Sequence, residues 1–531
     1  MLTLLTGDIG FQGDDWWVLS FPYWNPFPQS VLIYAKAALR PVEGLYWICL
    51  FELFGFNRFP YLFASLTLNV LSSTLFAVSL YRAFSDKPQL AVWGALFSFF
   101  MPMNSSLVFI MHTDNSRLAM IFFWACVVAL QRAIHGSPSL LGLSLICYLL
   151  SVLTYENASM LIFAMPFLAA SYANTNRPPL MKRFLLNKIL LFIAVGFLGF
   201  LAIRFLLLSG GAVSHAGVFP SLKLLVSYFR GVVDYLFAPW RDISFDAWSL
   251  IFGAAIGVAV HAFLKEKSHA AFSSANTIAS HNRSMLFVIG LGGVVFLLGV
   301  IPYVLAGYTA DIGFTGQSRI YSAGGFGVAM MLGAMFSLHC SAKLLRRLMN
   351  LTGVLLLAWL AAFQCEFRKD WQHAAEIRKD LCQSLLTIVP NVTDSTTLLF
   401  LDLQSYIGKR AVIYQGVDGL DEYVKMLYNN KSLHGYFLYS RQSESPNNSE
   451  RTAIVTPQGI IARGSLPYGP SPLDAILILR SYGRSFSLVK SLSHEDSFLD
   501  AQWVGVYRIA SQADRIVETK PESRRKQRCL Y

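Results

Sequence analysis

Apolar residues recur along this chain in long runs, and each run is separated from the next by a short polar segment. A membrane-spanning helix needs about 20 consecutive apolar residues, because the hydrocarbon core is ~30 Å thick and a helix rises ~1.5 Å per residue. The pattern therefore predicts an α-helical polytopic membrane protein with about ten transmembrane helices, in the runs 59–81, 90–110, 117–133, 139–154, 158–173, 189–208, 248–264, 285–305, 323–341 and 348–364.

Residues 139–173 allow two arrangements, a helical hairpin or one long tilted helix. A single helix would place Glu156 in the middle of the bilayer and the basic cluster 177–188 on the outer side. Both consequences are costly. We therefore expect a hairpin that turns at Tyr155-Glu156-Asn157.

After residue 365 the apolar runs become short and are separated by Gly, Pro, Asn and Ser, which is typical of strands. The expected organisation is a first loop with interfacial helices (1–58), a transmembrane domain (59–364), a small soluble α/β domain (365–515) and a basic flexible tail (516–531). Strands are expected at 397–401, 411–414, 452–455 and 475–479.

Composition agrees with the membrane class: 54% of the residues are hydrophobic and only 14% are charged. The net charge of +12 does not indicate nucleic-acid binding, because Lys and Arg fall largely in the gaps between apolar runs and in the tail. Seven cysteines show no CxxC or Cys/His spacing, so neither a zinc site nor a disulfide framework is predicted.

The basic residues also predict an orientation. One set of alternate gaps carries thirteen Lys and Arg residues and the opposite set carries five, so the first set is cytoplasmic by the positive-inside rule. Both the first 58 residues and the segment after 365 then lie on the extracytoplasmic face, of a bacterial inner or plasma membrane. Because an exported loop of 58 residues needs a preceding helix, we expect the coding sequence to start upstream and to add an eleventh helix.

The ionisable residues that are candidates for catalysis or substrate binding fall on the outer face. Asp14 and Asp15 are adjacent in a Trp-rich segment, and a carboxylate pair beside lipid is costly unless it performs chemistry or meets a cation. An enzyme on this face has no ATP or nucleotide sugar, so it needs a substrate that is already activated on a lipid carrier. Asp14 and Asp15 are the catalytic candidates, and the candidate substrate-binding residues are Arg40, His112, Asp114, Arg117, Glu156, Arg204, Arg319 and Tyr321.

Sugar transfer from a lipid phosphate would give these residues distinct roles. A base must deprotonate the acceptor hydroxyl, and a close pair of carboxylates tends to raise one pKa of the pair, which improves a base. The leaving phosphate needs fixed positive charge, which Arg117, Arg204 or Arg319 can supply.

Several short segments follow one another in a fixed order: Asp14-Asp15, Arg40-Pro41, Gly55-Phe56 before a helix with Asn69, Leu153-Thr154-Tyr155-Glu156 before Pro166, Arg319-Ile320-Tyr321 before a Gly-rich helix, and Trp371 with a helical stretch to Pro390. Over residues 10–390 this order resembles the GT-C superfamily of polyprenyl-phosphate-sugar-dependent glycosyltransferases, which includes protein O-mannosyltransferases and lipid A aminoarabinose transferases. The resemblance implies a GT-C fold, inversion at the anomeric carbon and a phosphate-binding role for Arg319.

Structural explanations remain open for the same residues. The aspartate pair and Glu156 are also typical of residues that cap helix N-termini. Arg319 could pair with Asp311. Arg204 could extend to the membrane interface, and Arg40 could anchor a loop. No cofactor is predicted; His112 and Asp114 are two possible ligands of a divalent cation, and two ligands do not define a metal site.

Three functions are therefore compared. The first is an extracytoplasmic glycosyltransferase that takes a polyprenyl-phosphate sugar and a lipid, glycan or protein acceptor. The second is a lipid-linked polysaccharide polymerase or ligase, which would depend on outer-loop arginines. The third is a non-enzymatic transporter of lipid-linked glycans, which would show internal repeats and charges deep within several helices. The chain shows no clear repeat and sparse buried charge, which counts against the transporter, and the glycosyltransferase is the leading hypothesis.

Overall fold

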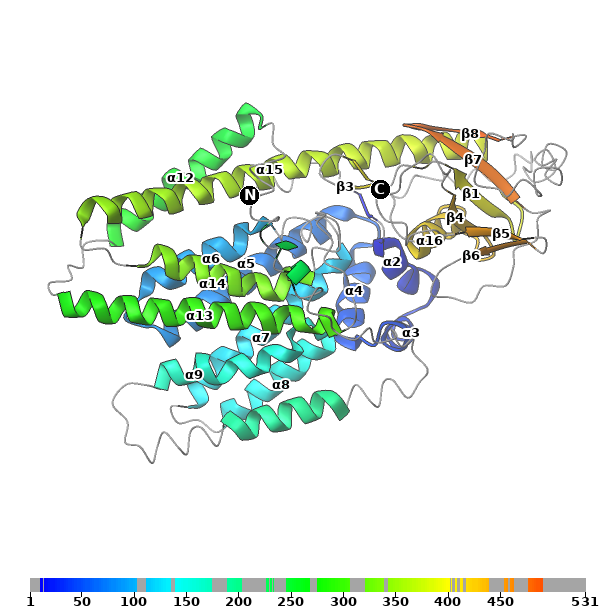
Figure 1. The fold of residues 1–531 in the computed structure, drawn as a ribbon. Coiled ribbons are helices and arrows are strands. Elements are labelled where there is room, and N and C mark those ends of the chain that lie inside the picture. Colours follow the sequence, from blue (N-terminus) through cyan, green and yellow to red (C-terminus); the bar gives the residue numbers. More distant parts are fainter. Residues whose placement is uncertain are drawn as a thin grey trace.

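A computed structural model gives the fold (Figure 1). It describes residues 10–12, 14–102, 111–134, 139–173, 189–202, 226–228, 230–231, 233, 245–267, 275–305, 320–338, 342–401, 403, 406–407, 411–413, 417–438, 453–456, 459–462 and 476–489. The structure is mostly helical, with a small sheet at one end.

Four of the described helices are long and apolar enough to cross a membrane by length and composition. They are α5 (Arg58–Ala83), α7 (Asp114–Ala133), α13 (Ala275–Leu305) and α15 (Lys343–Ile388). These helices are compatible with the predicted helical membrane protein. The expectation of about ten full spans is wrong for the described residues, because the remaining apolar runs form helices of 10–17 residues: Pro88–Phe100, Ser139–Thr154, Glu156–Ala169, Ile189–Ala202, Ala247–Phe263 and Ser322–Phe336.

The bounds of two shorter helices coincide with a proline or an extended residue. Helix α6 (Pro88–Phe100) begins at a proline, and α8 (Ser139–Thr154) is followed by Tyr155 in an extended conformation. A 3-10 helix, η4 (Glu156–Ala164), then leads into α9 (Met165–Ala173). The helix is therefore interrupted at Tyr155-Glu156-Asn157, where the sequence predicts the turn of a hairpin.

Two glycine pairs let α13 approach α14 (Ser322–Phe336) closely. A Cβ on Gly327 would lie 2.4 Å from the carbonyl oxygen of Gly292, and one on Gly299 would lie 2.5 Å from the backbone nitrogen of Gly324. Small residues allow this kind of helix contact in membrane proteins. The two helices consequently pack backbone against backbone.

The small sheet has the strand order β4-β1-β7-β8. Strands β1 (Thr397–Leu401), β4 (His434–Leu438) and β7 (Ile476–Tyr482) are parallel, and β8 (Ser485–Leu488) is antiparallel to β7. Every residue of β1 is buried, as expected for a central parallel strand. Helix α16 (Val417–Leu427) connects β1 to β4, with β2 (Tyr406–Ile407) and β3 (Ala411–Val412) before it and the hairpin of β5 (Ala453–Thr456) and β6 (Gly459–Ala462) after β4. All four expected strand positions are confirmed.

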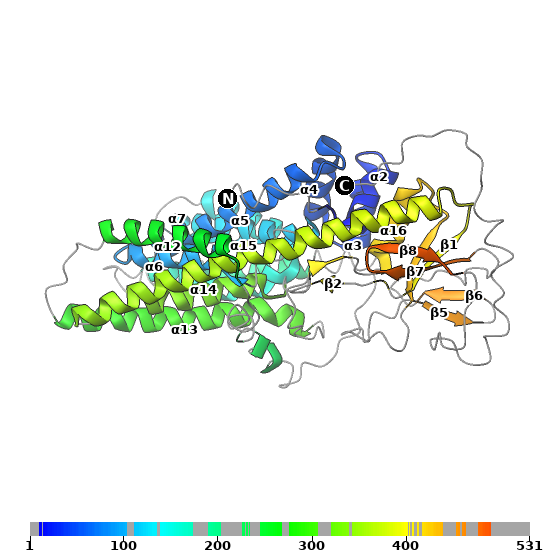
Figure 2. The same ribbon diagram turned by 90° about the horizontal axis from the view of Figure 1, so that it is seen from above.

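Helix α15 connects the two parts of the molecule. Figures 1 and 2 show it running from the membrane-type helices along to the sheet, with α12 (Ala247–Lys267) beside its first half. At the sheet end, Ser384 Oγ accepts the Phe486 N–H at 2.8 Å, and Arg484 forms an ion pair with Asp380 at 3.1 Å. The sheet is therefore fixed to the far end of a helix that also packs among the membrane-type helices.

The described residues between 10 and 57 include three helices, α2 (Asp14–Trp24), α3 (Gln29–Ala38) and α4 (Pro41–Phe54). They lie between the membrane-type helices and the sheet (Figure 1). Large apolar side chains on α3 and α4 are exposed, among them Leu32 and Leu53. Such a surface suits helices that lie at a membrane interface.

The glycine contacts give a test of the packing. Gly327→Ala should lower the free energy of unfolding by about 1–3 kcal/mol, because the new methyl group meets backbone atoms that cannot rotate away. Gly293→Ala is the matched control, since a Cβ there meets nothing within 4 Å. Thermal unfolding of both variants in the same detergent measures the difference. Equal melting temperatures would mean that α13 and α14 do not pack as described.

Candidate functional site

The acidic candidates lie in the first turns of helices. Asp14 and Asp15 begin α2, Asp114 begins α7, and Glu156 begins η4. The amide groups of a first helical turn have no partner within the helix, so a carboxylate is favoured there. This agrees with the helix-cap explanation that the sequence left open. It also places four carboxylates at helix N-termini, where the helix dipole gives a positive potential.

The two aspartates of α2 differ in environment. Asp15 is 0% exposed, and its Oδ2 accepts the Gln12 N–H at 3.0 Å. Asp14 is half-buried. An adjacent buried guanidinium, that of Arg58 at the start of α5, interacts electrostatically with Asp15. Asp15 is therefore fixed in the protein interior, whereas Asp14 keeps contact with the surface.

Asp114 lies in a second buried group. Its Oδ2 accepts hydrogen bonds from Ser65 Oγ at 2.8 Å and from Tyr46 Oη at 3.1 Å. Its Oδ1 lies 3.8 Å from Arg117 Nη1, one turn along α7. Arg58, whose Nε donates to the Gly10 carbonyl at 3.0 Å, also interacts electrostatically with Asp114. Arg58 thus connects the α2 aspartate to the α7 aspartate.

Arg40 and Glu156 form a two-pronged ion pair. Arg40 Nε and Nη2 donate to the two carboxylate oxygens of Glu156 at 3.0 and 2.9 Å, and the guanidinium stacks over the Tyr155 ring at 4.2 Å. A planar fork of donors matches a carboxylate in this way. The pair joins the start of α4 to the start of η4, which are 116 positions apart in sequence.

Glu43 completes the polar layer. It is fully buried on α4, its Oε1 accepts from Asn115 Nδ2 at 2.9 Å, and its Oε2 lies 3.7 Å from Arg40. Burial penalises the charged carboxylate and raises the pKa of Glu43 to about 7, although Arg40 acts in the opposite direction. Because Asn115 follows Asp114 directly, the Arg40 group and the Arg58 group are adjacent.

We refer to these residues as the polar end cluster: Asp15, Arg40, Glu43, Tyr46, Arg58, Ser65, Asp114, Asn115, Arg117 and Glu156. Five of the sequence candidates, Asp15, Arg40, Asp114, Arg117 and Glu156, are members. Five members were missed by sequence reasoning: Glu43, Tyr46, Arg58, Ser65 and Asn115. A signal existed for Glu43 and Arg58, because each is a lone charge beside an apolar run.

The other candidates are placed elsewhere or not described. Tyr321 is buried at the start of α14, 5.8 Å from the Tyr228 ring, and its neighbour Ser322 accepts a hydrogen bond from Asn157 at 3.0 Å. It therefore lies beside the start of η4. Arg204, Arg319 and the side chain of His112 lie outside the described residues.

Among the described side chains, no group of three or more His, Cys, Asp and Glu residues is arranged to hold a metal ion. The prediction concerning His112 and Asp114 remains untested, because the His112 side chain is not described.

Comparison of the chain with protein-family models, with curated proteins and with solved structures gives no match.

The pKa of Glu43 predicts a pH dependence of stability. Its folded-state value is above the ordinary 4.5, so the stability that it contributes is fully present below pH 4.5 and is lost as the pH rises through about 7. Glu43→Gln cannot ionise, so its melting temperature should fall less than that of the wild type between pH 5 and pH 8. Thermal unfolding in detergent at several pH values measures both slopes.

The exposed Glu52 of the same helix provides the control, since Glu52→Gln should leave the wild-type slope unchanged. Identical slopes for the wild type and Glu43→Gln would contradict a buried Glu43 whose pKa is raised.

Proposed function

We propose that this protein is an inverting membrane glycosyltransferase that transfers a sugar from a polyprenyl-phosphate donor to an acceptor hydroxyl on the extracytoplasmic face. The observation that supports this most directly is the polar end cluster. Carboxylates and guanidinium groups from α2, α4, α5, α7 and η4 meet at one place, although they are far apart in sequence. Acid and positive charge are the two requirements of the reaction.

In this proposal Asp14 is the base. It begins α2 beside the buried Asp15 and retains surface exposure, so an acceptor hydroxyl can reach it. Asp15 is a positioning residue: its carboxylate is used by the Gln12 amide and by Arg58. The proton of the acceptor hydroxyl passes to Asp14. The acceptor oxygen then forms the new bond to the anomeric carbon, and the lipid phosphate leaves from the opposite face of the sugar.

The leaving phosphate requires fixed positive charge. Arg58 and Arg117 are buried within the polar end cluster, and Arg40 is at its partly exposed edge. By the GT-C resemblance Arg319 contacts the phosphate as well. Arg204 is also proposed to supply positive charge to the leaving phosphate.

One observation supports an extracytoplasmic location for the cluster and the sheet. The positive-inside distribution places the gaps with fewer basic residues outside.

Separate substitution of the two aspartates tests the proposal. Asp14→Asn should lower kcat about 10²–10⁴-fold without changing the melting temperature, because only the base is lost. Asp15→Asn should lower both activity and stability, because Arg58 is buried and loses a negatively charged neighbour. The measurements are sugar transfer from labelled polyprenyl-phosphate sugars in membranes, and thermal unfolding.

Glu52→Gln is again the matched control, since this carboxylate is exposed on α4 and should be dispensable. Full transfer by both aspartate variants would reject the catalytic assignment. If transfer instead depended on Arg40 and Arg117 alone, a lipid-linked polymerase or ligase would be the better explanation.

A further inference from the structure

Helix α2 does not rest on the membrane-type helices alone. On one side Trp16 packs against Phe11 at 5.6 Å, and Phe11 packs against Tyr61 of α5 at 5.3 Å. The Trp16 ring also lies 4.9 Å from Tyr423 of α16. Trp16 and Tyr423 are both almost completely buried. The residue next to Asp15 is thus enclosed between α5 and the sheet region.

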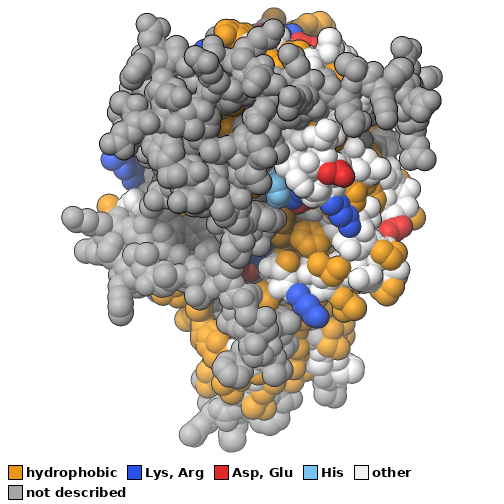
Figure 3. All heavy atoms as spheres, turned by 90° about the vertical axis from the view of Figure 1, so that its right-hand side faces the viewer, with side chains coloured by type: hydrophobic (Ala, Val, Ile, Leu, Met, Phe, Trp, Pro, Cys, Tyr) orange, Lys and Arg blue, Asp and Glu red, His pale blue; other side chains and the backbone are white. Residues whose placement is uncertain are grey.

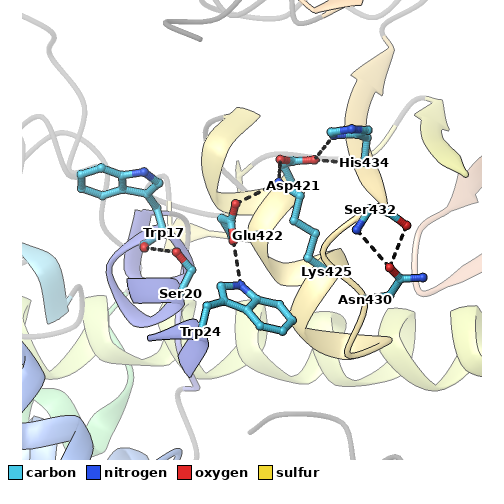
Figure 4. A network of polar contacts seen from close by, with 10 residues as sticks. Trp17, Ser20, Trp24, Asp421, Glu422, Lys425, Asn430, Ser432 and His434 are labelled. Carbon is cyan, nitrogen blue, oxygen red and sulfur yellow. Dashed lines mark hydrogen bonds and ion pairs between the residues drawn. The ribbon is translucent and has the colours of Figure 1, made fainter. Parts of the chain in front are cut away.

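A second set of contacts holds the other end of α2. Trp24 Nε1 donates to Glu422 at 3.4 Å, Tyr23 Oη donates to Asn429 at 3.0 Å, and the Lys431 ammonium lies 5.0 Å from the centre of the Trp24 ring. Figure 4 shows Glu422 between Trp24 and the rest of α16. The contacts therefore extend over the whole length of α2.

The α16 side of this interface is itself firmly held. Asp421 accepts the Gly435 N–H at 2.9 Å, which fixes α16 to strand β4. Lys425 forms ion pairs with Asp421 and Glu422, and His434 lies 3.3 Å from Asp421 (Figure 4). The surface that contacts α2 is thereby part of the sheet, and the sheet is fixed to α15.

We propose that Glu422, Tyr423 and Asn429 form a positioning surface that sets the place of α2, and with it of Asp14 and Asp15, relative to the polar end cluster. This inference rests on the proposed function for its catalytic consequence. It assigns the sheet region a role in alignment, because Tyr423 is buried against Trp16, and Glu422 and Asn429 accept hydrogen bonds from Trp24 and Tyr23 of α2. A shift of about 1 Å in a catalytic group can cost about 10²-fold in rate.

Figure 3 views the structure from the sheet side. On the described part of this face, Lys, Arg, Asp and Glu side chains lie next to apolar side chains, so both kinds of surface are present there.

Substitutions of Tyr423 test whether the sheet region aligns α2. Tyr423→Ala removes the ring that contacts Trp16 and should lower kcat at least tenfold, while KM for the donor changes less than threefold. Tyr423→Phe keeps the ring and should restore kcat to within about twofold of the wild type. Tyr482→Ala is the control, because this tyrosine is in the same sheet and is 60% exposed.

Hydrogen exchange of the full-length protein gives a readout that does not depend on enzyme activity. Amides of residues 16–20 should exchange faster in Tyr423→Ala than in the wild type and in Tyr423→Phe, and amides of α13 should be unchanged. Unchanged exchange in α2 would reject the positioning surface, whatever the activity. Faster exchange in α2 with unchanged kcat would also reject it. Faster exchange in a protein without any transferase activity would reject the proposed function but retain the physical contact.

Discussion

The buried guanidinium of Arg58 is the group on which the rest of the site depends. A charged side chain is excluded from a protein interior unless other charges and hydrogen bonds compensate for the water that it loses. Arg58 has the Gly10 carbonyl, Asp15 and Asp114 around it; Gly10 and Asp15 come from the segment that begins α2, and Asp114 comes from the start of α7. The start of α5, the start of α2 and the start of α7 must therefore be brought together for any of them to be buried.

The other charged side chains around Arg58 also need hydrogen-bond or ion-pair partners. Asp114 needs Ser65 and Tyr46 as donors, Glu43 needs Asn115, and Arg40 needs Glu156. Each contact links the beginning of one helix to another element, and a carboxylate at a helix start is favoured by the free amides there. The result is a layer in which electrostatic requirements fix the relative positions of the helices at this end. Backbone contact through glycines fixes α13 against α14 elsewhere.

The sheet region adds a constraint that the membrane-type helices do not supply. It is joined to them through α15 and contacts α2 through α16. A short helix such as α2 is marginally stable by itself, since most helical stability comes from tertiary packing. With aromatic contacts on both sides of Trp16, α2 acquires a defined position, and its two aspartates acquire defined and different environments.

Apolar runs and short strand-like segments were sufficient to predict a helical membrane protein with a small sheet, the break at Tyr155 and the four strand positions, because burial requirements act locally along the chain. They were insufficient for the number of spans, because the same composition allows helices of 10–17 residues. The sequence by itself also pointed to Asp15, Arg40, Asp114, Arg117 and Glu156 as unusual charges. Only the tertiary structure decided their partners, because an ion pair between positions 116 residues apart depends on how the helices pack and leaves no pattern in the local sequence.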